Sequence, residues 1–252
     1  MTVAVDALRE SVARLRGLVA GLSDDRLQTP AYPTEWTIAD VLSHIGSAAV
    51  IQQQRLEDAL AGRSTADDFA PGIWDKWNAK SPTSKAADGL AADATFAGRL
   101  QQLTDQGADV SIAMGPLTLD LAALTGLRLN EHALHTWDIE VVLDPTATLP
   151  AQATAVVVDN LELIGRFTAK PTGATRSVAV HVTEPERDFA IQLTPEKVTF
   201  EAGANATSQP DLTMPAEAFV RLIYGRLDPD HTPAVSGDEA RLDELRIIYP
   251  GP

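Results

Sequence analysis

Apolar residues in the first half of the chain recur at spacings of three and four, the period of an amphipathic helix. In the first such stretch, residues 6–22, the stripe consists of Leu8, Val12, Leu15, Leu18, Val19 and Leu22. Comparable stripes predict three further helices, at residues 38–61, 86–106 and 117–142. Thr37 is the expected N-cap of the second helix, with Asp40 in the capping-box position. Four helices connected in this way predict an antiparallel bundle.

The segment between the second and third helices, residues 62–84, is predicted to be a loop. It is interrupted by acidic residues, glycine and proline, namely Asp67, Asp68, Pro71, Gly72 and Pro82. It also contains Trp74 and Trp77, which is unusual for a connection exposed to water.

Residues 143–152 contain two prolines among small polar residues, which indicates a domain boundary. We expect one domain at residues 1–146 and a second at residues 150–252. In the second half, a helix is predicted at 153–168. Short alternating runs, typical of strands, follow at 177–182, 188–193, 197–202 and 211–214, and two more helices are predicted at 216–224 and 239–247. The predicted fold class is a four-helix bundle followed by a small α+β domain.

Composition narrows the possible functions. The chain of 252 residues has a formal net charge of −15, so binding to nucleic acid or to an anionic membrane is not expected. No apolar run approaches the roughly 18 residues that span a bilayer, and we expect a cytoplasmic protein. The absence of cysteine excludes disulfides, thiolate ligands and a cysteine nucleophile. Any thiol chemistry must therefore use a thiol from outside the chain.

A candidate metal site follows from the positions of the histidines. Glu131 and His135 are four residues apart and so project from the same face of a helix, which their apolar neighbours direct towards the bundle interior. His44 lies on the core-facing side of the second helix. Two histidines and one carboxylate are a common zinc ligand set that leaves one coordination position open. Nickel, iron and manganese are compatible with the same ligands.

Two alternatives remain open at this stage. A histidine on a helix face is more often a hydrogen-bonded structural residue than a metal ligand. In addition, His132 and His135 are three residues apart and could form a pair without Glu131.

A family resemblance adds to this interpretation. Residues 35–45, EWTIADVLSHI, and residues 130–139, NEHALHTWDI, resemble the mycothiol-dependent maleylpyruvate isomerase family, whose first domain is a DinB-like bundle. Residues 222–226, LIYGR, and 235–238, VSGD, resemble the closing pattern of its sterol-carrier-like C-terminal domain. The resemblance implies that His44, Glu131 and His135 bind one zinc ion, and that Trp36, Trp137 and Asp138 occupy family positions beside them.

The resemblance also implies the chemistry. Zinc in this family binds the thiolate of mycothiol, which adds to a maleylpyruvate double bond, allows rotation and leaves again, whereas other relatives are S-transferases. Arg226 corresponds to an arginine that assists the isomerase, and Trp77 and Asn78 correspond to a family feature at the cofactor. The expected partners are a small thiol and an electrophilic substrate, and the expected state is a monomer or homodimer.

Several roles remain alternatives. Asp138 either orients a ligand or faces solvent, and Trp36, Trp74 and Trp77 either line the pocket or anchor the core. Two other functions also remain open: a catalytically silent DinB-like protein that binds metal and thiol, and a carrier of small hydrophobic molecules through the C-terminal domain.

Overall fold

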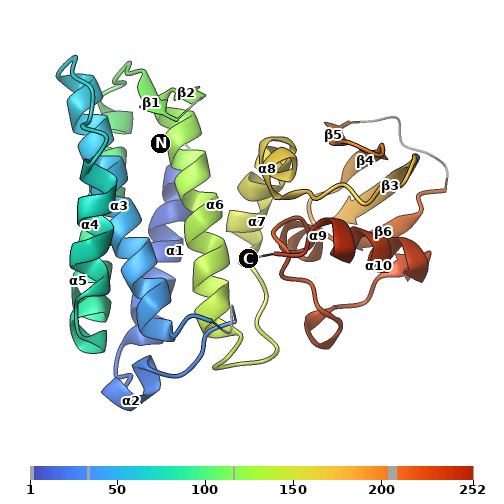
Figure 1. Cartoon of the computed structure of the whole chain (residues 1–252), viewed down its shortest axis with the longest axis horizontal. Helices are drawn as coiled ribbons and strands as arrows, with labels where there is room; N and C mark the ends of the chain where they lie inside the picture. The colour runs from blue at the N-terminus through green and yellow to red at the C-terminus, as the bar shows by residue number, and fades with distance from the viewer. Residues whose placement is uncertain (1–2, 33–34, 116, 204–208, 252) are drawn as a thin grey trace. The chain divides into compact units, whose positions relative to one another are not determined.

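The computed structural model describes residues 3–32, 35–115, 117–203 and 209–251 (Figure 1). The chain divides into two compact units, Met1–Ala147 and Thr148–Pro252, which are described separately. The first unit is helical and the second combines helices with a sheet, which confirms the predicted fold class. Among the described residues, every helix is too short or too polar to cross a bilayer.

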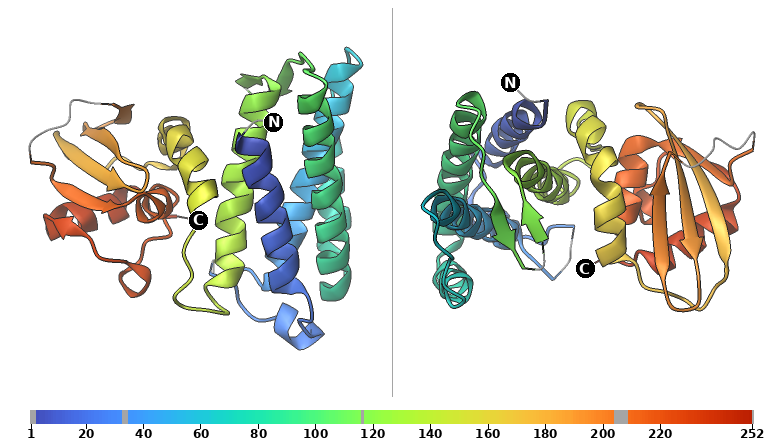
Figure 2. Two further views of the ribbon diagram at one scale, coloured as in Figure 1. Left: turned by 180° about the vertical axis from the view of Figure 1, so that it is seen from behind. Right: turned by 90° about the horizontal axis from the view of Figure 1, so that it is seen from above.

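The first unit is built around four long helices. Its helices are α1 (Val3–Val19), α2 (Asp24–Leu27), α3 (Ile38–Leu60), α4 (Phe69–Asn78), α5 (Pro82–Asp105) and α6 (Leu121–Glu140). The helix α3 packs mainly on α5, while α1 packs on both α6 and α5, so the four long helices enclose one core (Figure 2). Each predicted helix of the bundle is present, with ends that differ by a few residues.

The start of α3 follows the prediction closely. The Thr37 hydroxyl accepts a hydrogen bond from the backbone N–H of Asp40, and the Asp40 carboxylate accepts one from the backbone N–H of Thr37. This capping box satisfies backbone donors that the first helical turn leaves without partners. It therefore defines where α3 begins, two turns before His44.

Two expectations for the first unit are wrong. Residues 69–78 form the helix α4 rather than part of a loop; its sequence signal is weak because it has no side-chain N-cap and buries only Trp77 completely. Residues 117–119 form a strand, β2 (Leu117–Leu119), which pairs with β1 (Ile112–Met114). The helix α6 begins only at Leu121, because the Asp120 carboxylate accepts a hydrogen bond from the N–H of Ala123.

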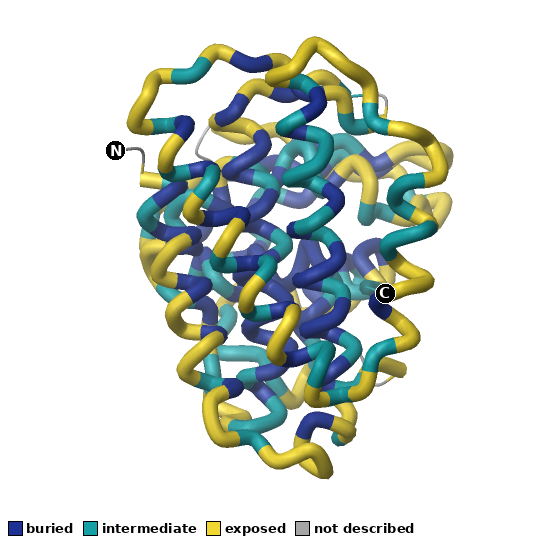
Figure 3. Tube along the Cα trace, turned by 90° about the vertical axis from the view of Figure 1, so that its left-hand side faces the viewer, coloured by how far each residue is buried: buried dark blue, intermediate teal, exposed yellow. Residues whose placement is uncertain are grey.

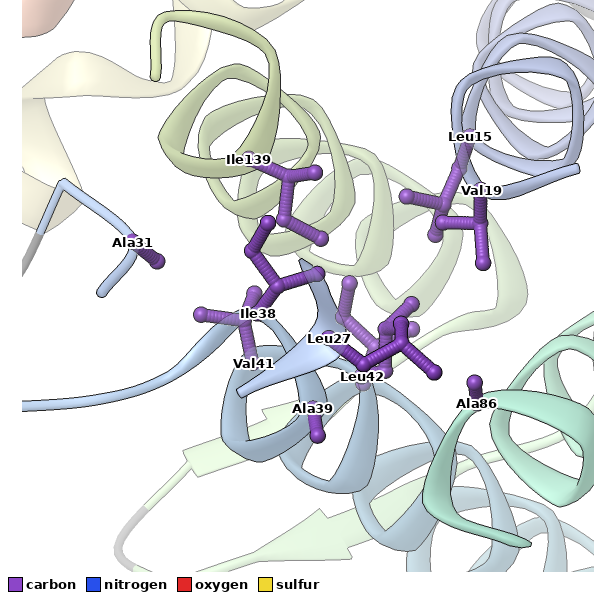
Figure 4. Packing of buried hydrophobic residues seen from close by; sticks show 11 residues of the cluster. Leu15, Val19, Leu27, Ala31, Ile38, Ala39, Val41, Leu42, Ala86 and Ile139 are labelled. Carbon is purple, nitrogen blue, oxygen red and sulfur yellow. The ribbon is translucent and has the colours of Figure 1, made fainter. Parts of the chain in front are cut away.

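The apolar core of the first unit includes a cluster at the end of the bundle where α3 begins. Figure 4 shows Leu15 and Val19 of α1, Ile38 of α3 and Ile139 of α6 converging there. Along α1 and α5, buried positions alternate with exposed ones from turn to turn, whereas α3 and α6 are buried or half-buried along most of their length (Figure 3). The single buried stripe of α1 and α5 is the pattern that the apolar spacing predicts.

The second unit holds a five-stranded sheet with strand order β5-β4-β3-β6-β7. Its strands are β3 (Arg176–Thr183), β4 (Arg187–Leu193), β5 (Val198–Ala202), β6 (Leu212–Pro215) and β7 (Ser236–Gly237). Its helical segments are α7 (Ala151–Val157), η1 (Val158–Asn160), α8 (Leu161–Thr168), α9 (Ala216–Ile223), η2 (Pro229–His231) and α10 (Glu239–Ile248). Among the described strands, only β3 and β6 pair in parallel, and α9 packs against β3, α7 and α8.

The predicted strands and the helices α9 and α10 are confirmed. The helix predicted at 153–168 is divided by the short η1 segment, and β7 was not predicted because it contains two residues. The core of this unit includes three stacked aromatic rings, Phe189, Phe200 and Phe219, with centroids 4.9 to 5.7 Å apart.

Glycine permits a close crossing of α3 and α5 near the candidate site. A Cβ atom on Gly46 of α3 would lie 2.6 Å from the Cα of Gly89 in α5, and closer still to the ring of Trp77. A Cβ atom on Gly89 would lie 2.6 Å from the backbone oxygen of Leu42. The two helices can therefore approach this closely only without side chains at these two positions.

We expect Gly46→Ala to lower the free energy of unfolding by about 1–3 kcal/mol, the usual cost of overpacking, because backbone of α5 must shift. Gly98→Ala is the matched control, since Gly98 lies in the same unit on α5 with open space around its Cα. That control should be neutral or stabilising, as helix propensity favours alanine. Urea denaturation of both variants measures the difference, and equal stabilities would contradict a tight crossing.

Candidate metal centre

Three side chains from two helices converge in the first unit. His44 lies in the second turn of α3, and Glu131 and His135 lie one turn apart on α6. The Oε2 atom of Glu131 is 3.5 Å from Nε2 of His44 and 3.7 Å from Nε2 of His135. All three ligand atoms lie within 4.8 Å of one another. Ligands about 2.1 Å from a tetrahedral zinc ion are about 3.4 Å apart, so the observed spacing fits such an ion.

Local structure holds these helices together beside the cluster. The backbone N–H of Tyr32, in the segment before α3, donates a hydrogen bond to the carbonyl of Asp138 at 2.9 Å. The Tyr32 ring meets the buried ring of Trp137 edge-on, with centroids 4.9 Å apart. Trp137 in turn donates from its indole N–H to the carbonyl of Ala147. The segment that leads into α3 is thus attached to the turn of α6 that carries His135.

Asp138 orients the imidazole of His135. Its carboxylate is completely buried and accepts a hydrogen bond from Nδ1 of His135 at 2.8 Å. This contact assigns the proton to Nδ1 and leaves the Nε2 lone pair directed at the cluster. Of the two alternatives for Asp138, the orienting role is therefore the one that the structure shows.

The electrostatics of the cluster suit a cation. Burial opposes ionisation of Glu131, but the hydrogen bonds and charges of His135 and His44 outweigh this and hold the pKa of the carboxyl well below its ordinary value. Burial also disfavours the charged form of His44 and therefore lowers its pKa. The hydrogen bond and charge of Glu131 raise this pKa but only partly offset the effect of burial. At neutral pH the cluster therefore offers one carboxylate and a neutral His44 ring, the protonation states that a metal ion requires.

The cluster is open to solvent on one side. The side chain of Glu131 is 43% exposed and that of His44 is 35% exposed, so solvent contacts part of both side chains. Trp36 borders the opening, with its ring centroid 5.2 Å from that of His44 and 6.0 Å from that of His135. Of the three tryptophans considered from the sequence, Trp36 is thus the one observed beside the candidate ligands.

The alternative pairing of His132 with His135 is excluded by the direction of the two rings. His132 is completely buried on another face of α6, where Nε2 donates to the Asp93 carboxylate at 2.7 Å and Nδ1 lies 2.7 Å from the Ser11 hydroxyl. Arg128 donates to the other Asp93 oxygen at 2.6 Å. This buried network was missed, although a carboxylate at position 93, on the apolar stripe with Phe96 and Leu100, was a visible signal.

The remaining predicted site residues are Trp77 and Asn78 of α4 and Arg226 of the second unit. Trp77 of α4 is buried, and its ring packs against Gly46 of α3. Gly46 is two residues after His44 and so lies on nearly the opposite face of α3. Asn78 is exposed. Arg226 belongs to the second unit, where its buried guanidinium donates to the carbonyl of Tyr224 at the end of α9. The roles assigned to these three residues stay predictions. The other two histidines pair with aspartates of the second unit, His181 with Asp188 and His231 with Asp228.

A helical bundle with an open two-histidine, one-glutamate cluster, followed by an α+β unit, defines the class of this protein. Residues 8–140 match the family model described as the mycothiol maleylpyruvate isomerase N-terminal domain, and residues 148–244 match the C-terminal domain model of the same family. The chain therefore belongs to the mycothiol-dependent maleylpyruvate isomerase family, as the resemblance predicted.

Solved structures agree on the fold. The chain is similar to a crystal structure of the mycothiol-dependent maleylpyruvate isomerase, with 12% sequence identity, a TM-score of 0.64 and 90% of each chain covered. A histidine-to-alanine mutant of such an enzyme gives 11% identity with the same TM-score and coverage. No protein of curated function matches the chain in sequence.

We expect the His44 imidazole of the metal-free protein to titrate below its ordinary pKa of 6.5, because burial disfavours the charged ring. A group is protonated only below its pKa, so the ring stays neutral over a wider range of pH than a free histidine. Glu131→Gln should lower this pKa further, since it removes the carboxylate that stabilises the imidazolium. Two-dimensional ¹H–¹⁵N NMR of the histidine rings measures both values, and an unchanged or raised pKa in the variant would contradict the assignment.

Proposed function

We propose that this protein is a zinc-dependent enzyme that activates a low-molecular-weight thiol, mycothiol, for addition to a small electrophilic substrate. Membership of the mycothiol-dependent maleylpyruvate isomerase family supports a thiol-dependent isomerisation. The observation that carries the proposal is the convergence of His44, Glu131 and His135 on one point that solvent can reach. The donor set fits zinc, and the absence of cysteine fits a thiol supplied from outside the chain.

Each residue of the cluster has a role in this proposal. His44 and His135 would hold the ion through Nε2 and Glu131 through a carboxylate oxygen, with one position left for the thiol sulfur. Zinc, when bound, lowers the pKa of a coordinated thiol and so supplies a thiolate nucleophile at neutral pH. Asp138 keeps the ring of His135 in the tautomer that presents Nε2. Trp36 provides an apolar wall beside the open position.

Isomerisation and S-transfer share the first step, in which the thiolate sulfur forms a bond to a carbon of the substrate double bond. In isomerisation the resulting carbanion allows rotation, the carbon–sulfur bond breaks and the thiol is regenerated. In S-transfer the carbanion is protonated and the thioether remains. The substrate decides between these outcomes, so product analysis by mass spectrometry distinguishes an isomerase from a transferase.

The purified protein should contain close to one zinc ion per chain by elemental analysis. His44→Ala should lose most of this zinc, because two remaining ligands bind a divalent ion far more weakly than three. His231→Ala is the control, since that ring pairs with Asp228 in the second unit, and it should keep the metal. Zinc retained by His44→Ala would exclude the proposed centre.

The same preparations test the thiol. Calorimetry should detect mycothiol binding to the zinc-loaded protein but not to the His44→Ala variant, and Asn78→Ala should weaken binding if the exposed Asn78 contacts the thiol. Binding without turnover across a panel of electrophiles, maleylpyruvate included, would favour the alternative of a catalytically silent binding protein.

Arg226 is proposed, on the family resemblance, to bind a carboxylate of the substrate. Arg226→Lys in the zinc-loaded enzyme should lower kcat/KM by roughly tenfold or more, since one hydrogen bond to a charged group contributes about 1.5–3 kcal/mol. Zinc content should not change. If the variant loses thermal stability but keeps its kcat/KM, the role of Arg226 is structural: it stabilises the end of α9 through its hydrogen bond to the carbonyl of Tyr224.

The carrier alternative has one observation in its favour. The second unit contains a pocket of about 480 Å³ lined by apolar residues that include Leu212 and Leu242. Glu239 and Arg246 also line it, so its walls are not suited to a purely apolar ligand. Fatty acids or sterols that co-purify with the protein would support the carrier function.

A further inference from the structure

We infer that Asp93 is a positioning residue for the metal centre, because it sets the rotation of α6 and the position of α3 at the level of the three ligands. The inference rests on the proposed function, since it assigns Asp93 to the same site. Asp93 itself lies on α5 and is completely buried. It acts through Arg128 and His132 of α6.

The first observation is that one buried carboxylate holds two turns of α6. Arg128 donates to Oδ1 of Asp93 at 2.6 Å and His132 donates to Oδ2 at 2.7 Å. All three side chains are buried, with at most 1% exposed. Burial alone would raise the pKa of Asp93, but His132 and Arg128 lower it to about 2, so both oxygens accept hydrogen bonds at neutral pH. Charge-assisted bonds in a dry core are strong and directional.

The second observation is the position of this pair on the helix. His132 follows Glu131 directly, and Arg128 precedes Glu131 by three residues. Successive residues on an α-helix are 100° apart, so the midline of the pair that Asp93 holds and the midline of the pair Glu131 and His135 are offset by about 60° around α6. A rotation of α6 that moves Glu131 away from His44 therefore breaks both bonds to Asp93.

The third observation connects the network to α3. The Arg128 nitrogen that donates to Asp93 also donates to the backbone carbonyl of Ile45 at 3.0 Å. Ile45 directly follows His44, so the guanidinium bridges α5, α6 and the turn of α3 that carries the third ligand. Ser11 of α1 completes the network at Nδ1 of His132. All four long helices of the bundle thus meet beside the candidate ligands.

A purely structural role would affect stability without a specific effect on the site, so a matched control is needed. Asp58 is another buried carboxylate of this unit and accepts hydrogen bonds from Gln54, Arg63 and Thr65. It lies fourteen residues after His44 on α3, about 21 Å away along the helix. Asp93→Asn and Asp58→Asn therefore remove equivalent charges near to and far from the metal centre.

Two readings are taken on each folded variant, with folding verified by circular dichroism. The first is zinc affinity, by competition with a chromophoric chelator. The second needs no metal: it is the NOE between the rings of His44 and His135, whose centroids are 4.6 Å apart. Asp93→Asn should weaken zinc binding by roughly tenfold or more, the effect typical of residues that orient metal ligands, and should lose the NOE. Asp58→Asn should keep both.

An Asp93→Asn variant with the zinc affinity and the ring NOE of the unaltered protein would overturn the inference. If Asp93→Asn does not fold, Arg128→Met is judged by the same two readings, since methionine keeps an unbranched side chain but has no N–H donor for Asp93 or for the carbonyl of Ile45. An unaltered protein that shows the NOE but binds no zinc would overturn the proposed function instead. The NOE comparison then still decides whether Asp93 positions the two rings.

Discussion

The rotation of α6 about its own axis is the constraint on which the candidate centre depends. One stripe of this helix presents Glu131 and His135 to His44, and a neighbouring stripe presents Arg128 and His132 to Asp93. The first stripe brings the Glu131 carboxylate close to two imidazoles, which stabilise its charged form. The second stripe consists of completed charge-assisted bonds in a dry core. The bonds of Arg128 and His132 to Asp93 therefore help to hold Glu131 and His135 in place on the same helix.

The two histidines of α6 show how environment separates a ligand from a structural residue. Both rings pair with a buried aspartate, His135 with Asp138 and His132 with Asp93. The ring of His132 has partners at both nitrogens and no contact with solvent. The ring of His135 directs Nε2 at Glu131, next to the solvent-exposed opening. The same side-chain pair thus stands in two environments, one closed within the core and one beside the Glu131 carboxylate.

The relation to solved enzymes is carried by fold rather than by sequence. An identity of 11–12% over 90% of the chain means that most side chains differ, while the family models still cover both units. A metal-activated external thiol is one chemistry that this cysteine-free chain can support with the residues of its cluster.

The sequence by itself determined the elements and the candidate ligands. Helical spacing located the four long helices, and the capping residues Thr37 and Asp40 gave the start of α3, because these signals act within a few residues of one another. The spacing of Glu131 and His135 also put them on one face. Only the tertiary structure excluded the alternative pairing of His132 with His135, placed Asp138 in the core against His135, and made residues 69–78 helical. These outcomes depend on contacts between residues far apart in sequence, such as Asp93 with His132 and Trp77 with Gly46, which local periodicity does not record.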